Sequence, residues 1–208
     1  MSTDQDTVRS YNMVAAEYAA EAAAMPDWVA TEIDAFVRDL GGSGRVLEIG
    51  SGGGRDALEL AKRGISVRCT DVSKAFVELL RESGLEADLL DPLTDDLADP
   101  RRPGMLYDGV WACASLIHVA RQDFGTVAGR LAEATRTGGR LHASVREGDG
   151  EDVAIHPGSN APRRYTETYW REPALRSALT NAGWIVSDIL RYTGRPDDRW
   201  LSVRAGRA

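Results

Sequence analysis

The sequence predicts an α/β protein with a doubly wound, mainly parallel sheet of seven strands. Short apolar segments alternate with amphipathic helical segments over most of the 208 residues, which is the pattern of helices packed on both faces of a parallel sheet. A glycine-rich turn, GSGGG, joins the first apolar segment to a helical one. Ligands of such sheets bind beyond the carboxyl ends of the strands, so we expect the functional site at that edge.

Two helices are expected before the first strand. Residues 4–24 are rich in alanine and place Tyr11 and Tyr18 on one face, two helical turns apart. Pro26 suits the first turn of a second helix, and apolar residues at helical spacing continue this helix up to Gly41.

The remaining chain alternates between expected strands and helices. Ser73 is expected to cap one of these helices and Gly84 to end it. The stretch from Glu147 to Arg164 is polar and aperiodic, and we expect it to form a surface loop or a lid. The seven expected strands are Arg45–Ile49, Ile65–Thr70, Glu86–Leu90, Asp108–Ala114, Arg140–Val145, Trp184–Tyr192 and Trp200–Arg204.

Composition narrows the class of protein. The formal net charge of −7 argues against a broad nucleic-acid-binding surface. No apolar run approaches the length of a membrane span, and the polar, acidic first residues do not resemble a secretory signal. Cys69 and Cys113 lie far apart without a Cys/His cluster, so no metal site is expected. We therefore expect a cytoplasmic protein that binds a small molecule and neither nucleic acid nor membrane.

The glycine-rich turn predicts the kind of ligand. A dinucleotide fingerprint is G-x-G-x-x-G. Gly50 and Gly52 supply its first two glycines, but Arg55 stands at the third position. Glu48 precedes the turn, where a carboxylate repels a pyrophosphate and suits a cation. Asp71 ends the second expected strand, about 20 residues after Gly50, where a carboxylate can bind both ribose hydroxyls. The pattern indicates an adenosine with a cationic, phosphate-free tail.

Four segments carry a resemblance to a known family: VLEIGSGGGRDALELAKRG, TDVS, YDGVWACASLIHV and TGGRLHASV. In order and spacing they resemble the class I S-adenosylmethionine-dependent methyltransferases, well over residues 45–145 and more loosely beyond. The resemblance implies a Rossmann-like methyltransferase fold, with an N-terminal helical lid over 1–42 and an S-adenosyl-L-methionine-binding domain over 43–208. It implies methyl transfer to a small-molecule nucleophile, with S-adenosyl-L-homocysteine as the product.

The resemblance also implies a cofactor-binding set. Asp71 is expected to bind the ribose, with Val72 beside the adenine. An acidic residue after the third strand is expected to bind the adenine amino group, and an ungapped count from Asp71 favours Asp91, with Asp88 as the alternative. The expected cofactor-binding residues are Tyr18, Glu48, Gly50, Ser51, Gly52, Asp71, Val72, Leu90, Asp91, Ala112 and Cys113.

Candidates for the chemistry lie beyond the fourth strand and in the first helix. His118 falls at the expected catalytic edge and is the candidate general base, although a histidine there can also bond a backbone group. Tyr11 and Arg146 are candidates for substrate binding. The first helix either closes over the cofactor as a mobile lid, with Tyr18 touching it, or is docked permanently. The accepting atom (O, N, S or C), the need for a base and the oligomeric state stay open.

Two other functions are compatible with these motifs. One is an RNA or protein methyltransferase, which the acidic balance and the absence of an Asn-Pro-Pro-aromatic motif disfavour. The other is a catalytically inactive cofactor-binding protein that serves as a regulator or partner. Its signature would be cofactor binding without turnover.

Overall fold

The computed structural model describes residues 4–156, 163–194 and 198–208. Within them the strands are β1 (Gly44–Ile49), β2 (Ile65–Asp71), β3 (Ala87–Leu89), β4 (Tyr107–Cys113), β5 (Thr135–Glu147), β6 (Glu151–His156), β7 (Arg163–Trp170), β8 (Trp184–Thr193) and β9 (Arg199–Arg207). The helices are α1 (Gln5–Glu21), α2 (Asp27–Asp39), α3 (Arg55–Lys62), α4 (Lys74–Glu82), the short 3₁₀ helix η1 (Leu116–His118), α5 (Arg121–Glu133) and α6 (Glu172–Asn181). No helix of these residues has both the length and the apolar character of a membrane span.

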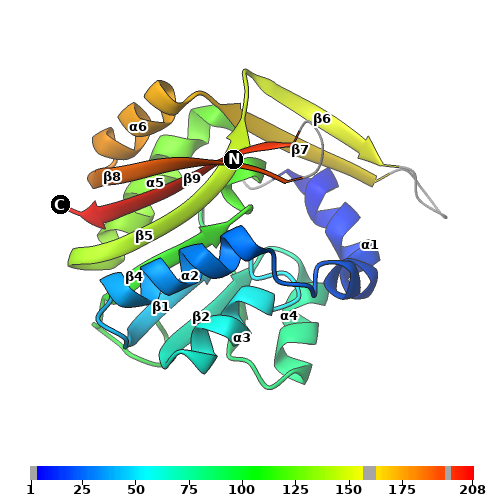
Figure 1. The fold of residues 1–208 in the computed structure, drawn as a ribbon. Helices are drawn as coiled ribbons and strands as arrows, with labels where there is room; N and C mark the ends of the chain where they lie inside the picture. The colour runs from blue at the N-terminus through cyan, green and yellow to red at the C-terminus, as the bar shows by residue number, and fades with distance from the viewer. Residues whose placement is uncertain (1–3, 157–162, 195–197) are drawn as a thin grey trace.

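The strands form one sheet in the order β3-β2-β1-β4-β5-β7-β6, and β9 and β8 extend it from β5 (Figure 1). The pairs from β3 through β5 are parallel, whereas β9 is antiparallel to both β5 and β8. The predicted doubly wound, mainly parallel α/β sheet is thus confirmed. The parallel register brings the carboxyl ends of β1, β2 and β4 to one edge.

Alternate residues of the central strands face opposite helical layers. Val46 of β1 packs with α2 and α3, and the next residue, Leu47, packs in the cluster that α5 and α6 cover. Burial on both faces explains why these strands read as continuous apolar runs in the sequence. The two layers hold the carboxyl edge of the sheet rigidly in place.

The strand count differs from the predicted seven, because the structure has nine strands among the described residues. The two additional strands, β6 and β7, form an antiparallel hairpin. β6 lies within the stretch predicted as a loop or lid, whereas β7 begins at the end of that stretch and continues through residues for which no strand was predicted. Residues 157–162 of that stretch lie outside the described residues. β5 is also longer than predicted and reaches Glu147, so that its end pairs with Trp170 of β7. This pairing places the hairpin above the carboxyl end of β4.

The second helix, α2, is anchored in the core. The Glu32 side chain is buried and accepts two hydrogen bonds of 2.8 Å from the Arg204 guanidinium. The Tyr192 hydroxyl donates a third bond of 2.7 Å. His142, Arg204 and Tyr192 together hold the pKa of Glu32 well below its usual range despite its burial. Since losing one partner of a buried ion pair costs several kcal/mol, these bonds fasten α2 to β8 and β9.

Candidate active site

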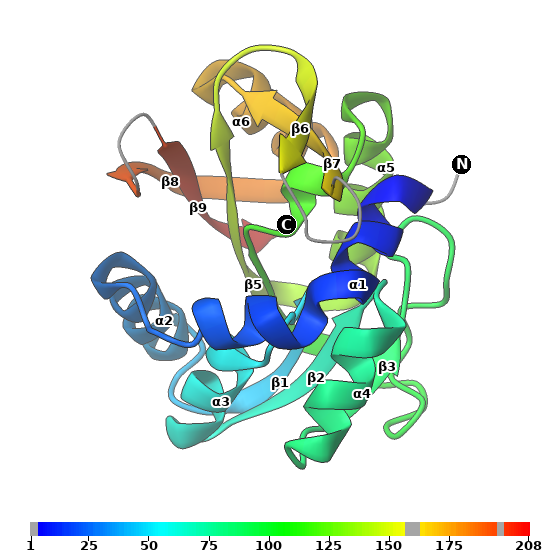
Figure 2. The same ribbon diagram turned by 90° about the vertical axis from the view of Figure 1, so that its right-hand side faces the viewer.

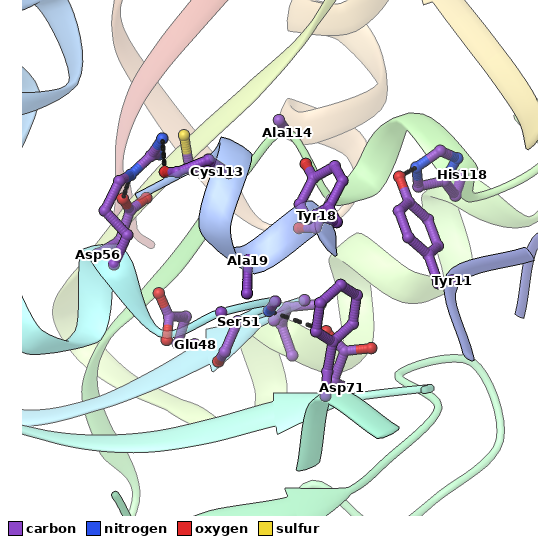
Figure 3. Close-up of a pocket in the computed structure, with 18 of the residues that line it drawn as sticks. Tyr11, Tyr18, Ala19, Glu48, Ser51, Asp56, Asp71, Cys113, Ala114 and His118 are labelled. Carbon is purple, nitrogen blue, oxygen red and sulfur yellow. Dashed lines mark hydrogen bonds and ion pairs between the residues drawn. The ribbon is translucent and has the colours of Figure 1, made fainter. Parts of the chain in front are cut away.

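A cavity of about 360 Å³ lies between α1 and the carboxyl ends of β1, β2 and β4, within the size range of small-molecule sites. Figure 2 shows α1 running across this edge of the sheet, and Figure 3 shows the side chains around the cavity. It is lined by eleven of the residues expected at the site, which are Tyr11, Tyr18, Glu48, Gly50, Ser51, Gly52, Asp71, Val72, Leu90, Cys113 and His118.

The glycine-rich turn follows β1 and forms one wall. Gly50 and Gly52 have φ angles of 69° and 52°, in the left-handed region that favours glycine. A Cβ at Gly50 would lie 2.5 Å from Cβ of Ser115, in the segment after β4. The close approach of these two segments therefore depends on glycine.

The helix α1 packs directly on this turn. A Cβ at Gly53 would lie only 2.7 Å from Cβ of Ala19. The ring of Tyr18 reaches the neighbouring Gly52, with Cε1 3.9 Å from the Cβ position there. The cavity is therefore covered by α1 in this structure.

Replacing Gly53 by alanine is expected to weaken the docking of α1, because the new methyl group overlaps Ala19. The φ angle of Gly53 lies outside the left-handed region, so the turn itself tolerates the change. Overpacking costs about 1–3 kcal/mol, which hydrogen exchange over residues 8–20 will detect as faster exchange. The double variant Gly53→Ala with Ala19→Gly should recover only part of the protection, because the Ala19 Cα still lies 3.0 Å from the new methyl group and glycine weakens a helix. Unchanged exchange in Gly53→Ala would contradict the close packing.

Glu48 is a buried carboxyl without a complete set of partners. Its side chain lines the cavity, and Oε2 has no hydrogen-bond partner among the described residues. Burial, with a smaller contribution from the Asp56 and Asp71 carboxylates, raises the pKa of Glu48 to about 8. A buried carboxyl of this kind is stabilised by a cationic ligand group.

Asp71 ends β2 and is held in place by the backbone. Its Oδ1 accepts a hydrogen bond of 2.8 Å from the Ser73 N–H, and Oδ2 accepts one of 3.0 Å from the Gly52 N–H. Burial raises its pKa to about 6, although these backbone bonds act in the opposite direction. The carboxylate is thereby oriented at the cavity before any ligand arrives.

His118 and Tyr11 form a hydrogen-bonded pair on the other side of the cavity (Figure 3). The Tyr11 hydroxyl lies 2.8 Å from Nε2 of His118, and Nδ1 lies 2.7 Å from the Thr166 carbonyl oxygen. A carbonyl can only accept, so Nδ1 carries the hydrogen and Nε2 of the neutral ring accepts from Tyr11. Burial lowers the pKa of His118, which favours this neutral form.

Three expected site residues lie outside the cavity lining. Ala112 faces the opposite layer and is fully buried in the core with α5, because neighbouring residues of a strand face opposite sides. The Arg146 guanidinium pairs with Asp198 and stacks over Trp200, with Cζ 4.7 Å from the ring centroid. The Asp91 carboxylate accepts a hydrogen bond from the backbone N–H two residues later, which turns it into the loop.

The alternative acid, Asp88, is also placed away from the cavity. Its carboxylate forms hydrogen bonds of 2.7 Å with both Arg68 and Arg101. These arginines hold its pKa at about 2. Neither of the two acids proposed for the adenine amino group is among the residues lining the cavity, whereas Leu90 is.

The sequence analysis did not assign Arg55 and Asp56 to the site, although both line the cavity. Arg55 was considered only as a missing glycine. Its guanidinium bonds the Asp56 carboxylate at 2.7 Å and the Ala22 carbonyl, at the end of α1, at 3.4 Å. The position of Arg55 directly after the turn was the available signal. With Glu48 and Asp56, it gives the cavity one cationic and two acidic groups.

Ala114 was also missed as a strained position. It follows β4, lines the cavity and has a φ angle of 55° without being glycine. Its N–H donates to Oγ of the buried Ser144 at 2.8 Å, which holds the strained turn in place. The left-handed conformation costs about 1–2 kcal/mol, and such strain concentrates at functional sites.

Comparison with known proteins identifies the domain. Residues 46–139 match the family model described as a methyltransferase domain. A search of curated proteins gave no match. Among solved structures, the chain is similar to the 1,6-didemethyltoxoflavin-N1-methyltransferase of Burkholderia thailandensis, which contains 1,6-didemethyltoxoflavin and S-adenosylhomocysteine. The identity is 22%, the match covers 97% of this chain and 88% of that one, and the TM-score is 0.68.

Two further solved structures are similar over nearly their whole length. The magnesium protoporphyrin IX methyltransferase of Synechocystis PCC 6803, with bound S-adenosylmethionine, is 18% identical, with 99% and 98% of the two chains covered and a TM-score of 0.69. The [4+2]-cyclase SpnF is 16% identical, with 99% and 96% covered and a TM-score of 0.72. These similarities establish the fold: the chain has the fold of these methyltransferases, and its residues 46–139 match a methyltransferase domain.

Proposed function

We propose that this protein transfers the methyl group of S-adenosylmethionine to a nucleophilic atom of a small molecule by in-line displacement. When bound, S-adenosylmethionine supplies an electrophilic methyl group on a positively charged sulfur. The observation that carries the proposal is that one cavity combines the Glu48 and Asp71 carboxylates with the Tyr11–His118 pair. The similarity to methyltransferases of a toxoflavin precursor and of magnesium protoporphyrin supports a small-molecule substrate.

The residues present fit the cofactor. The incompletely partnered Glu48 carboxyl suits the ammonium group of the methionine moiety. The nearby Arg55 guanidinium suits the carboxylate of the same moiety. Asp71, held by two backbone N–H groups, suits the two ribose hydroxyls, and Val72 and Leu90 suit the adenine. Together these groups match a zwitterion at one end and a nucleoside at the other.

The pair of Tyr11 and His118 can accept the proton that the substrate nucleophile loses. The hydroxyl of Tyr11 takes the proton of an acidic nucleophile while its own proton moves to Nε2 of the neutral His118. A positioned base of this kind contributes about 10²–10⁴-fold to the rate. Orientation of the two reactants contributes about 7–11 kcal/mol. The rings of Tyr11, Tyr18 and Tyr165 lie against one another and exclude water from the reacting atoms.

Release of S-adenosylhomocysteine from a library of small molecules tests the proposed reaction. With an accepted substrate, His118→Ala is expected to lower turnover by about 10²–10⁴-fold, with little change in affinity for S-adenosylhomocysteine. Tyr11→Phe keeps the ring and should change turnover in the same direction. Unchanged turnover in both variants would assign them a structural role. Cofactor binding without turnover of any compound would favour the regulatory alternative.

A further inference from the structure

The edge of β7 that faces away from β6 is bound by side chains of α1. The Thr166 N–H donates to Oγ1 of Thr7 at 2.9 Å, and the Arg164 N–H donates to Oγ of Ser10 at 2.8 Å. Thr7 and Ser10 lie one helical turn apart and are 1% and 3% exposed. The hydroxyls therefore satisfy backbone donors that an unpaired strand edge would otherwise leave unbonded.

The peptide groups of Thr166 connect this edge to the Tyr11–His118 pair. Its N–H is bound by Thr7, and its carbonyl oxygen accepts from Nδ1 of His118. The Thr7 hydroxyl donates in turn to Asp4 Oδ2 at 2.8 Å, which also accepts from the Thr166 hydroxyl at 3.1 Å. Tyr11, one turn beyond Thr7 on α1, reaches the other ring nitrogen of His118. The hydrogen bonds thus form a closed ring through α1, β7 and η1.

We propose that Thr7 is a positioning residue for His118: by accepting from the Thr166 N–H it holds the backbone at this residue, whose carbonyl oxygen keeps the hydrogen on Nδ1 and leaves Nε2 as the acceptor for the Tyr11 hydroxyl. The inference rests on the proposed role of His118 in proton transfer. Because Thr7 and Tyr11 belong to the same helix, the docking of α1 also orients His118 for proton transfer. An undocked α1 leaves His118 without the Tyr11 hydroxyl and leaves the Thr166 N–H without the Thr7 hydroxyl.

The groups around His118 decide which readout is informative. Burial lowers the pKa of His118, and Arg146 of β5 acts in the same direction, whereas the hydrogen bond to the Thr166 carbonyl, Glu167 of β7 and Asp4 of α1 favour the protonated ring. Weakening the Thr166 bond lowers the pKa and hydration of the ring raises it, so these two effects oppose each other. The tautomer of the neutral ring changes in one direction only, because the Thr166 carbonyl oxygen is what holds the hydrogen on Nδ1.

Nitrogen-15 NMR of histidine-labelled protein tests the proposal without a substrate. The chain has three histidines, and His118→Asn assigns the signal of interest. In the wild type we expect the Nδ1–H tautomer and a pKa below the ordinary value. In Thr7→Val we expect mixed tautomers, whereas Thr7→Ser keeps the hydroxyl and should behave as the wild type.

Ser10→Ala is the matched control. It removes an equally buried hydroxyl that bonds the same strand, at Arg164 and not at the Thr166 peptide, so His118 should keep its tautomer and pKa. Wild-type His118 signals in folded Thr7→Val, or the same change in Ser10→Ala, would overturn the proposal. An Nε2–H tautomer in the wild type would overturn it too, and this outcome needs no variant to fold. Absent methyl transfer alongside the expected NMR result would count against the proposed function alone.

Discussion

Replacing Glu48 by glutamine is expected to stabilise the free protein and to weaken its binding of S-adenosylmethionine. In the free protein the buried carboxyl has a pKa of about 8, well above the ordinary value of about 4.3. Glutamine has nearly the same shape and avoids the cost of burying an ionisable group. The same substitution removes the anion proposed for the ligand's ammonium group. The charge-assisted bond is worth about 1.5–3 kcal/mol, which corresponds to about 10–100-fold in affinity.

The stability difference between Glu48→Gln and the wild type should depend on pH. Between pH values of about 4.3 and 8 the unfolded chain ionises Glu48 while the folded chain keeps the proton, so the wild type loses stability as the pH rises through this window. The advantage of Glu48→Gln should be about 1 kcal/mol at pH 5 and on the order of 3–4 kcal/mol near pH 7. Urea unfolding at the two pH values measures it, with the exposed Glu133→Gln as a control. Equal stability of Glu48→Gln and wild type at pH 7 would contradict a buried, incompletely partnered carboxyl.

The stability of the wild type falls as the pH rises, whereas its affinity for the cofactor should increase. A cationic ligand favours the ionised form of Glu48, so binding at neutral pH releases a proton. The affinity of the wild type for S-adenosylmethionine should rise as the pH approaches about 8, and that of Glu48→Gln should lack this component. Calorimetry in buffers of different ionisation enthalpy measures the proton release. If the affinity of the two proteins depended on pH in the same way, Glu48 would not contact the ammonium group of the ligand.

Replacing Asp71 by asparagine is expected to produce the largest loss of cofactor affinity. Each ribose hydroxyl bonded to the carboxylate contributes about 1.5–3 kcal/mol, so two bonds correspond to about 10²–10⁴-fold in affinity. The amide can replace at most one oxygen, and its NH₂ group faces either the Gly52 or the Ser73 N–H, both of which are donors. Calorimetric titration with S-adenosylhomocysteine measures the loss.

A second acidic residue provides the control for Asp71. Asp91→Asn should reduce affinity much less, because the Asp91 carboxylate bonds its own loop. If the two substitutions reduced affinity equally, the ribose assignment of Asp71 would be contradicted. Unfolding experiments on both variants separate lost binding from lost stability.

The buried strands could be predicted from the sequence because their apolar runs are local signals. β1 and β4 are covered on both faces by helices, so Val46, Leu47, Val110 and Trp111 are all buried. The helix start at Ser73 was also predictable, since its hydroxyl caps α4 by accepting from the Phe76 N–H. These features depend on residues close in sequence.

The hairpin of β6 and β7 could not be recognised from polarity, because its stability comes from distant residues. β7 is rich in threonine, tyrosine and tryptophan, which favour strands, but it also carries charged residues. The hydroxyls of Thr7 and Ser10 bind its free edge from the other end of the chain. No local pattern reports such a contact. Residues 147–164 were therefore interpreted as a loop or lid, and the rest of β7 was assigned to no strand.

In the candidate site, too, some residues could be predicted from the sequence and others could not. The glycine-rich turn and Asp71 lie at fixed places after β1 and β2, and both line the cavity. The direction of the Asp91 side chain depends on the local turn, and that of Arg146 on its ion pair with Asp198. Counting along the sequence cannot determine either direction. Arg55 could have been recognised, because it follows directly on the turn.

A crystal structure of the complex with S-adenosylhomocysteine tests the account most directly. We expect the ligand in the cavity beneath α1, with its ammonium group at the Glu48 carboxylate and both ribose hydroxyls at Asp71. Its sulfur should face the side of the cavity that holds Tyr11 and His118. A ligand bound elsewhere, or a sulfur turned away from the Tyr11–His118 pair, would contradict the proposed site and the proposed route of the proton.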